Sequence, residues 1–306
     1  MNVLMMYSTH VPTAEHVARI AALGGEVTVA TDEAGALDAA PDAEIIFGHR
    51  YLRQVLPVTT RLRWVQSTAG GVDRLPLDGL RERGVQLTRM TAAASIIARH
   101  AVTLAWALAR NIPTLVRQQD ARRWQQPSDW LPFPERALVL GTGSIGKAIA
   151  KRLRADGIWT AGGRRRDLPD LDFDEVRPAG AWAEALPRTD WLFVAAPAAA
   201  GRLVGATEIR ALPSHAIVVN VGRGASIDTD ALQRALTDGH LGGAALDVFD
   251  PTPAGPDDPI WTTPRLTVSP YVAAHHAERH RRTEAMCEAQ LARYTQGEPL
   301  HDTVDV

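Results

Sequence analysis

The chain has 306 residues, about twice the length of a typical single domain, and therefore has room for two hydrophobic cores. Hydrophobic residues make up 45% of it, charged residues make up 22%, and the formal net charge is -2. These values exclude a disordered or fibrous protein, and with so little net charge we expect no nucleic-acid partner.

Short apolar runs characterise the chain from its first residues. Residues 1–7 form an apolar run with no positively charged segment before it, which predicts a first strand and not a signal peptide. The longest apolar run, residues 101–109, is far shorter than the roughly 18 residues that span a bilayer. The single cysteine, Cys287, cannot form an internal disulfide and is predicted to be a buried, inert thiol. We therefore expect a cytoplasmic protein without a membrane partner.

Apolar runs alternate with helical patterns along both halves of the chain. In the first half, the runs at residues 3–7, 26–30, 44–47, 63–66 and 85–88 predict strands. Residues 92–111 then predict one long helix, and the polar stretch 117–136, rich in Trp and Pro, predicts a surface excursion. A second strand–helix series runs from 137 to about 269, and a last helix covers 275–294. Such alternation predicts an α/β protein with two doubly wound parallel sheets.

A glycine-rich turn follows the first strand of the second series. The sequence Gly141-Thr-Gly143-Ser-Ile-Gly146 joins an apolar strand to a helix. In this setting the first glycine permits a tight turn, the second lets a pyrophosphate approach the backbone, and the third lets helix and strand pack closely. The free amides of the helix N-terminus favour the anion. We therefore predict a dinucleotide site formed by Gly141, Gly143, Ser144, Ile145 and Gly146.

The end of the next strand indicates which dinucleotide binds. Arg164 lies 18 positions after Gly146, where an acidic residue would accept hydrogen bonds from the 2′-hydroxyl of NAD. Arg165 and Arg166 follow it, and guanidinium groups suit a 2′-phosphate. We therefore expect NADP as the cofactor, with Arg164 and Arg165 binding it and NAD still possible. The alternative is a solvated arginine loop without a ligand.

Motifs further along the chain carry a family resemblance. Residues 213–228, which include Val-Asn-Val-Gly-Arg-Gly, and residues 244–249, Ala-Ala-Leu-Asp-Val-Phe, closely resemble the signature of the D-isomer-specific 2-hydroxyacid dehydrogenases in order and spacing. Residues 67–73 resemble the family's substrate-side glycine loop, and residues 195–197 resemble the strand end beside the nicotinamide. The resemblance covers nearly the whole chain.

This resemblance implies two domains and a mode of assembly. A discontinuous, flavodoxin-like substrate domain would comprise residues 1–98 and 275–306, and a Rossmann dinucleotide-binding domain would comprise residues 99–274. The long helices at 92–111 and 275–294 would cross between the domains. The family also implies a homodimer formed through the cofactor domains.

The resemblance also assigns roles to individual residues. Arg223 would hold the carboxylate and carbonyl of a small 2-keto acid, and Asp247 would orient the nicotinamide carboxamide. A cation suits this reaction, because hydride addition builds negative charge on the carbonyl oxygen beside a fixed carboxylate. The further contacts expected are Ala196, Pro197, Val221 and Gly222 with the cofactor, and Gly70 and Gly71 with the substrate; no metal site is expected.

Two positions depart from the family pattern. The family's general acid is a histidine directly after a proline, but here Tyr271 follows the proline. The glutamate that supports that histidine is replaced by Thr252. The two losses are consistent with each other, because a glutamate that tunes a histidine has no task once the histidine has gone.

Three sources of the proton therefore remain open. Tyr271 could donate it if a cation such as Arg223 lowers its pKa. His275 could donate it instead, because it lies one turn beyond Tyr271 and on the same face if a helix begins there. An imine substrate would arrive already protonated and need less acid catalysis.

A different class of protein is a sensor that binds NAD(P)H without catalysis, similar to corepressor relatives of the family. A sensor does not need a guanidinium at a substrate carbonyl, so Arg223 argues against this class. The sequence thus predicts an NAD(P)-dependent oxidoreductase that transfers hydride between NADP(H) and a small carboxylate-bearing 2-keto or 2-hydroxy acid.

Overall fold

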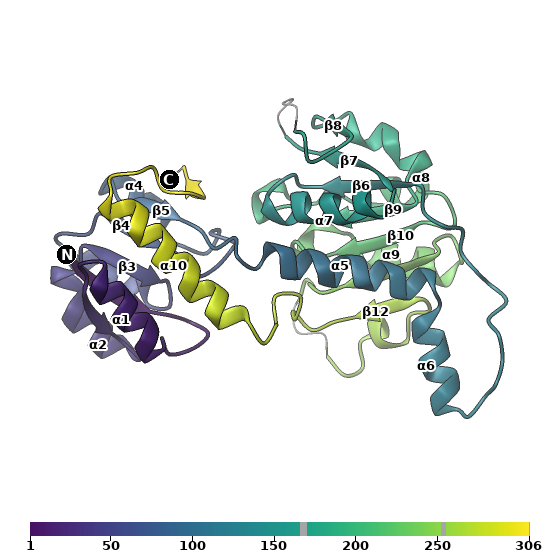
Figure 1. The fold of residues 1–306 in the computed structure, drawn as a ribbon. Helices are drawn as coiled ribbons and strands as arrows, with labels where there is room; N and C mark the ends of the chain where they lie inside the picture. Colours follow the sequence, from purple (N-terminus) through teal and green to yellow (C-terminus); the bar gives the residue numbers. More distant parts are fainter. Residues whose placement is uncertain (166–169, 252–254, 306) are drawn as a thin grey trace. The chain divides into compact units, whose positions relative to one another are not determined.

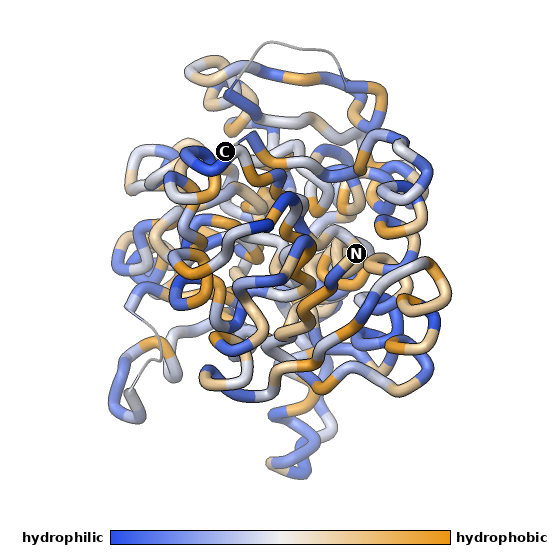
Figure 2. The backbone as a smooth tube through the Cα atoms, turned by 90° about the vertical axis from the view of Figure 1, so that its left-hand side faces the viewer, coloured by the Kyte–Doolittle hydropathy of each residue, from blue (hydrophilic) through white to orange (hydrophobic). Residues whose placement is uncertain are grey.

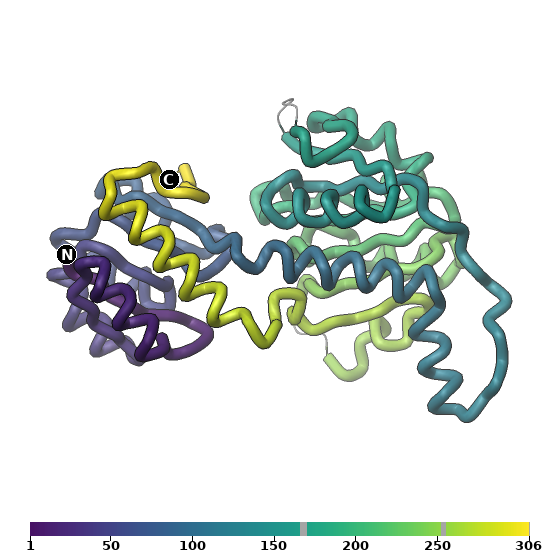
Figure 3. Tube along the Cα trace, in the orientation of Figure 1, coloured from purple at the N-terminus to yellow at the C-terminus, as the bar shows by residue number. Residues whose placement is uncertain are grey.

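The structure is a computed structural model that describes residues 1–165, 170–251 and 255–305. The chain forms two compact units, Met1–Ala93 with His276–Val306, and Ala94–His275. Figure 3 traces how the chain leaves the first unit, builds the second and returns to the first at its end. We call these unit 1 and unit 2 and describe each by itself.

Unit 1 contains a six-stranded sheet in the order β13-β5-β4-β3-β1-β2. Figure 1 labels β3, β4 and β5 of this sheet. Its strands are β1 (Asn2–Met6), β2 (Glu26–Val29), β3 (Ile45–Gly48), β4 (Trp64–Gln66), β5 (Gln86–Thr88) and β13 (Thr303–Val304). All neighbours are parallel except β13, which is antiparallel to β5. The helices of this unit are α1 (Ala14–Ala22), α2 (Glu33–Ala39), α3 (Leu52–Val55), α4 (Leu77–Glu82) and α10 (Arg279–Thr295).

The alternation of side chains along β1 divides the core of unit 1 into two layers. Val3 and Met5 pack on one face of the sheet with Ile20 of α1 and Leu291 of α10. The intervening residues point to the other face, where they pack with α2, α3 and α4. Cys287 of α10 is fully buried in the first layer, as predicted, and burial raises the pKa of its thiol to about 12.

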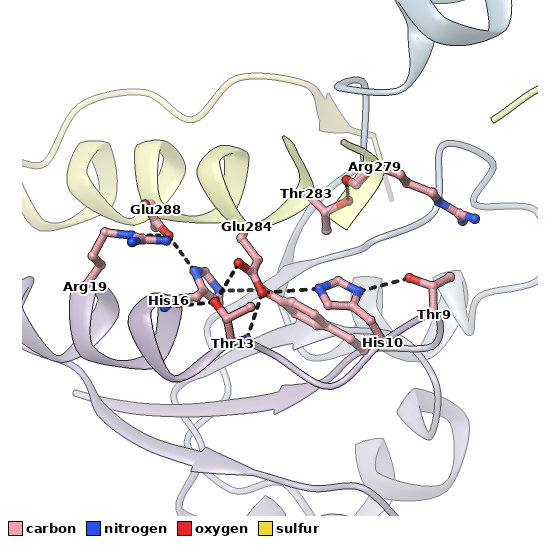
Figure 4. A network of polar contacts seen from close by, with 10 residues as sticks. Thr9, His10, Thr13, His16, Arg19, Arg279, Thr283, Glu284 and Glu288 are labelled. Atoms are coloured by element: carbon pink, nitrogen blue, oxygen red, sulfur yellow. Dashed lines mark hydrogen bonds and ion pairs between the residues drawn. The ribbon is translucent and has the colours of Figure 1, made fainter. Parts of the chain in front are cut away.

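Polar contacts also join α1 and α10, in addition to the apolar packing (Figure 4). The backbone amide and the hydroxyl of Thr13 donate hydrogen bonds of 2.9 and 2.8 Å to the two carboxylate oxygens of Glu284. The carboxylate of Glu288 lies 2.6 Å from Nδ1 of His16 and 2.8 Å from Nε of Arg19. The last long helix of the chain is therefore held to the first by both apolar and charged groups.

Unit 2 contains a parallel seven-stranded sheet in the order β12-β11-β10-β9-β6-β7-β8. Its strands are β6 (Arg136–Leu140), β7 (Trp159–Gly163), β8 (Glu175–Arg177), β9 (Trp191–Val194), β10 (Ile217–Asn220), β11 (Gly243–Leu246) and β12 (Leu266–Val268). Its helices are α5 (Ala94–Ala109), α6 (Ile112–Asp120), α7 (Ser144–Ala155), α8 (Ala206–Ala211) and α9 (Thr229–Thr237). Apolar side chains of α5 and α7 cover one face of this sheet, and those of α8 and α9 cover the other.

The predicted fold class is confirmed, because both series of strands form parallel α/β sheets. Figure 2 shows that hydrophobic and hydrophilic residues alternate along the backbone. Among the described residues, no helix is both long and apolar enough to cross a membrane.

Three expected segments need correction. The helix expected at 92–111 covers Ala94–Ala109, and the helix expected at 275–294 begins only at Arg279. The expected surface excursion starts inside a further helix, α6, which extends to Asp120.

Candidate active site

The carboxyl ends of the seven parallel strands of unit 2 define one edge of its sheet. The chain order reverses at β6, which lies between β9 and β7. Ligands of open α/β sheets bind outside the carboxyl ends of the strands at such a reversal. The residues predicted around the cofactor and the reacting carbonyl directly follow β6, β7, β9, β10, β11 and β12, so the topology brings them to this edge.

The glycine turn after β6 has the geometry expected of a pyrophosphate site. Gly141 has φ +104°, and a Cβ built there would lie 2.7 Å from the carbonyl oxygen of Ala195. A Cβ on Gly146 would collide with the carbonyl of Gly141, so helix and turn pack in direct contact. By contrast, a Cβ on Gly143 would meet no atom within 4 Å. Gly143 precedes α7 without a side-chain cap, which leaves the backbone amides of Ser144 and Ile145 at an open helix N-terminus.

The basic residues after β7 share their loop with an acidic one that the sequence analysis missed. The guanidinium of Arg164 lies 3.9 Å from the carboxylate of Asp170, whereas the ammonium of Lys147 in α7 lies 2.9 Å from it. The hydrogen bond to Asp170 raises the pKa of Lys147. Partial burial works to raise the pKa of Asp170, but the hydrogen bonds from Lys147 and the amide of Asp172, together with the charges of Lys147 and Arg164, outweigh burial and lower the pKa. Lys147 is therefore closer to this carboxylate than Arg164 is, and it also pairs with Asp172 at 3.1 Å. Arg165 is exposed, and Arg166 lies outside the described residues.

The loop after β10 is braced by a buried asparagine that the sequence analysis did not single out. Oδ1 of Asn220 accepts a hydrogen bond of 3.0 Å from the amide of Gly222, and its Nδ2 donates one of 2.9 Å to the carbonyl of Arg223. The Arg223 guanidinium donates to the carbonyl of Gly222 at 2.9 Å. A Cβ on Gly222 would lie 2.9 Å from the carbonyl oxygen of Ala196, so the loops after β9 and β10 touch. Val221 and Ala196 are buried and Pro197 is exposed.

The residues expected to supply the proton lie after β12. Tyr271 has φ +56° and is 66% exposed, and its amide donates to the carbonyls of Asp247 and Ser269. His275 is exposed, and its amide donates to the carbonyl of Val272 at 2.7 Å. No helix joins them, because α10 begins only at Arg279. The expectation that both lie on one helical face is therefore wrong. Thr252, at the family's glutamate position, lies outside the described residues.

A buried aspartate and a histidine lie beside this segment. Asp247, directly after β11, is 3% exposed, and its carboxylate accepts hydrogen bonds from the hydroxyl of Ser269 and the amides of Val272 and Ala273. His100 of α5 lies 3.1 Å from the hydroxyl of Ser269. His100 lies within the helix predicted at 92–111, and nothing in its local sequence indicates this contact.

The substrate-side glycines belong to unit 1. Gly70 and Gly71 are exposed in the loop after β4, at the carboxyl edge of that unit's sheet. Close by, Nδ1 of His49 lies 3.1 Å from the hydroxyl of Thr68, and burial lowers the pKa of His49. His49 was not predicted as a site residue, although it lies two residues after the strand predicted at 44–47.

Comparisons with known proteins agree with this architecture. A family model described as "D-isomer specific 2-hydroxyacid dehydrogenase, NAD binding domain" matches residues 102–273. A protein of Streptomyces coelicolor, described as an uncharacterized protein in the mprR 3′ region, is 38% identical over 78% of this chain and 87% of its own length. A glyoxylate reductase of Aeropyrum pernix is 27% identical over 79% of this chain and 76% of its own length.

Among solved structures, a D-isomer specific 2-hydroxyacid dehydrogenase family protein from Aeromonas salmonicida has a TM-score of 0.80 and 27% identity, with 99% of this chain and 98% of that chain covered. Fold, site and comparisons define an NAD(P)-dependent oxidoreductase that acts on CH–OH or C=O groups. The chain belongs to the D-isomer-specific 2-hydroxyacid dehydrogenase family.

Proposed function

We propose that this protein uses NADPH to reduce a small 2-keto acid to the 2-hydroxy acid. The observation that carries the proposal is Arg223, which the loop after β10 holds at the same sheet edge as the open glycine turn. Hydride would pass from the cofactor to the carbonyl carbon, and a proton would pass to the carbonyl oxygen. A planar guanidinium can bind both the substrate carboxylate and the oxygen on which charge develops.

The fixed backbone around Arg223 supports this role. Asn220 is 1% exposed and bonds to the loop at both Gly222 and Arg223. A group that must meet developing charge is most effective when the protein has already oriented it. This bracing supports Arg223 as the substrate-binding and transition-state cation.

The residues at the carboxyl edge also fit a dinucleotide. The open N-terminus of α7 with Gly143 would hold the pyrophosphate, Ala196, Pro197, Val221 and Gly222 would line the nicotinamide side, and Arg164 with Arg165 would bind a 2′-phosphate. When bound, the cofactor supplies the hydride. The basic loop favours NADP, and NAD remains a possible cofactor.

For the proton we propose Tyr271, with His275 as the alternative. Tyr271 occupies the family's histidine position directly after Pro270, and its exposed ring is accessible to a ligand. His275 is four residues further along a segment that is not helical, so the helical argument in its favour no longer applies.

We also propose that the protein is a cytoplasmic homodimer formed through unit 2, and that unit 1 binds the substrate through Gly70 and Gly71. Large exposed apolar side chains within residues 112–133 support the dimer, because such patches mark interaction surfaces. They are Ile112, Leu115, Val116, Trp124, Trp130 and Phe133.

A substrate scan tests the proposed function. The purified protein is mixed with NADPH or NADH and with short 2-keto acids such as glyoxylate, with simple aldehydes, or with cyclic imines, and absorbance is followed at the nicotinamide band. Turnover of 2-keto acids with NADPH is expected. Turnover of imines alone would favour an imine reductase, and cofactor binding without any turnover would favour a sensor.

A further inference from the structure

The carboxylate of Asp247 holds the segment that bears Tyr271. Its Oδ1 accepts hydrogen bonds from the hydroxyl of Ser269 at 2.6 Å and from the amide of Val272 at 2.9 Å. Its Oδ2 accepts one from the amide of Ala273 at 3.0 Å, and its backbone carbonyl accepts one from the amide of Tyr271, also at 3.0 Å. Asp247 therefore bonds to each residue of this segment except the proline, which has no backbone N–H to donate.

These bonds explain an unusual backbone conformation. Tyr271 has φ +56°, in the left-handed region that a bulky side chain rarely adopts. Such a conformation persists only where the surroundings hold it, and it recurs at functional sites. The bonds to Asp247 on both sides of Tyr271 provide that restraint, so the direction of the Tyr271 ring depends on Asp247.

A histidine extends the network into α5. The single hydroxyl proton of Ser269 is donated to Asp247, so the Ser269 oxygen can only accept from Nε2 of His100, which lies 3.1 Å away. Neutral His100 must therefore carry its proton on Nε2. The result is a directed chain of hydrogen bonds from His100 through Ser269 to a carboxylate that is 3% exposed.

We propose that His100, Ser269 and Asp247 are positioning residues for Tyr271, an inference that rests on the proposed role of Tyr271 as proton donor. A carboxylate has about four acceptor directions. Hydrogen bonds from the part of the chain that the structure describes use three of those on Asp247, Nε2 of His100 lies 3.6 Å from Oδ1, and one direction remains on Oδ2. The remaining direction is available to the nicotinamide carboxamide, so the same side chain would link a bound cofactor to the placement of the proton donor.

A double-mutant cycle tests this link. Ser269→Ala removes the hydroxyl between His100 and Asp247 but keeps Asp247 itself. We expect it to lower kcat about tenfold, the effect of one lost hydrogen bond, and to change the Kd for NADPH less than twofold. Ser269→Thr keeps a hydroxyl and should restore most of kcat. In a Tyr271→Phe background, Ser269→Ala should have no further effect, because the group it positions is gone.

A second pair of variants addresses the histidine. His100→Gln can still donate a hydrogen bond to Ser269 and should remain close to wild type, whereas His100→Leu should resemble Ser269→Ala. The matched control is His215→Leu, which breaks another histidine–carboxylate pair in unit 2, 2.7 Å from Asp190. That pair lies at the opposite edge of the sheet, before β9 and β10, so kcat should not change. Thermal unfolding of each variant checks that it is folded.

The outcomes are distinct. Loss of the Ser269→Ala effect in the Tyr271→Phe background supports the positioning role. The same fold-loss in both backgrounds overturns it but leaves Tyr271 as the donor. Full activity of Tyr271→Phe alone overturns the proposed proton donor, and the positioning role with it.

Discussion

Arg223 is the residue on which the proposed reaction depends most. Replacing it with alanine should lower kcat/KM for a 2-keto acid by at least about 10²- to 10³-fold, since a group that stabilises the developing oxyanion is lost. The Kd for NADPH should change little, because the glycine turn and α7 are not altered. Arg223→Lys keeps the positive charge but loses the planar guanidinium, so its kcat/KM should lie between those of the wild type and Arg223→Ala. Weakened NADPH binding with turnover retained would show that Arg223 serves the cofactor instead. Steady-state kinetics and fluorescence titration of NADPH measure both quantities.

Arg164 should decide the choice between the two nicotinamide cofactors. The wild type should bind NADPH more tightly than NADH, and Arg164→Asp should abolish or reverse this preference because the carboxylate repels a 2′-phosphate. Arg154→Asp is a matched control with the same change of charge near the C-terminal end of α7, where Arg154 pairs with Asp174. It should leave the preference intact. If the wild type binds NADPH and NADH with equal dissociation constants, the proposed role of Arg164 is wrong.

The proton donor can be identified by one pair of substitutions. Tyr271→Phe should lower the reduction rate by about 10²- to 10⁴-fold, the range for loss of a general acid, while His275→Ala should do much less. A tyrosine donor should also keep the enzyme active to higher pH than a histidine donor, whose activity falls as pH rises through about 6 to 8. If only His275→Ala loses activity, His275 is the acid. If neither substitution matters, the substrate brings its own proton.

At the scale of elements, the contact between α1 and α10 should make unit 1 sensitive to acid. Burial lowers the pKa of His10, whose ring stacks on His280 at 4.1 Å. Burial works to raise the pKa of Glu284, but the hydrogen bonds from Thr13 and the nearby His16 and His10 together outweigh burial and lower the pKa. Both groups therefore bind protons more readily in the unfolded chain than in the folded one, so their contribution to stability is complete only above the unfolded pKa values.

The free energy of unfolding should consequently fall as pH drops below about 6.5, first through His10 and then, below about 4.5, through Glu284. His10→Gln should flatten the dependence between pH 7 and 5, whereas His301→Gln, at an exposed position of the same unit, should leave it unchanged. Denaturant unfolding at several pH values measures the slope. A slope for His10→Gln equal to that of the wild type would contradict this account.

The sequence predicted best those elements whose residue pattern is visible within a few neighbouring residues. Central strands such as β1, β3 and β9 are short apolar runs, and the Gly141–Gly146 turn directly follows another, β6, so these features could be recognised from the sequence. The segment after Pro270 could not, because its amides bond to Asp247, a partner more than 20 residues away in the chain. These hydrogen bonds to Asp247 outweigh the helical tendency of the local sequence, so α10 begins at Arg279 and not at His275. The pairing of Lys147 with Asp170, which are 23 residues apart, was missed for the same reason.

At the scale of the molecule, two parallel sheets and a middle segment that matches the NAD binding domain of the 2-hydroxyacid dehydrogenases establish the fold and the class of enzyme. By the motif resemblance, Tyr271 stands where a histidine is expected, while the arginine expected for the substrate is present as Arg223. The central claim is therefore that this protein still reduces a carbonyl whose neighbouring carboxylate is bound by Arg223.

The most direct test compares two substrates that differ only in that carboxylate. Glyoxylate and glycolaldehyde both present an aldehyde carbonyl, but only glyoxylate carries a carboxylate beside it. With NADPH and the purified wild-type protein, we predict a kcat/KM at least about 10²-fold higher for glyoxylate, because a site built to pair with a substrate group discriminates strongly against an analogue that lacks it. Equal values for the two compounds, or no oxidation of NADPH with glyoxylate or any other short 2-keto acid, would contradict the account.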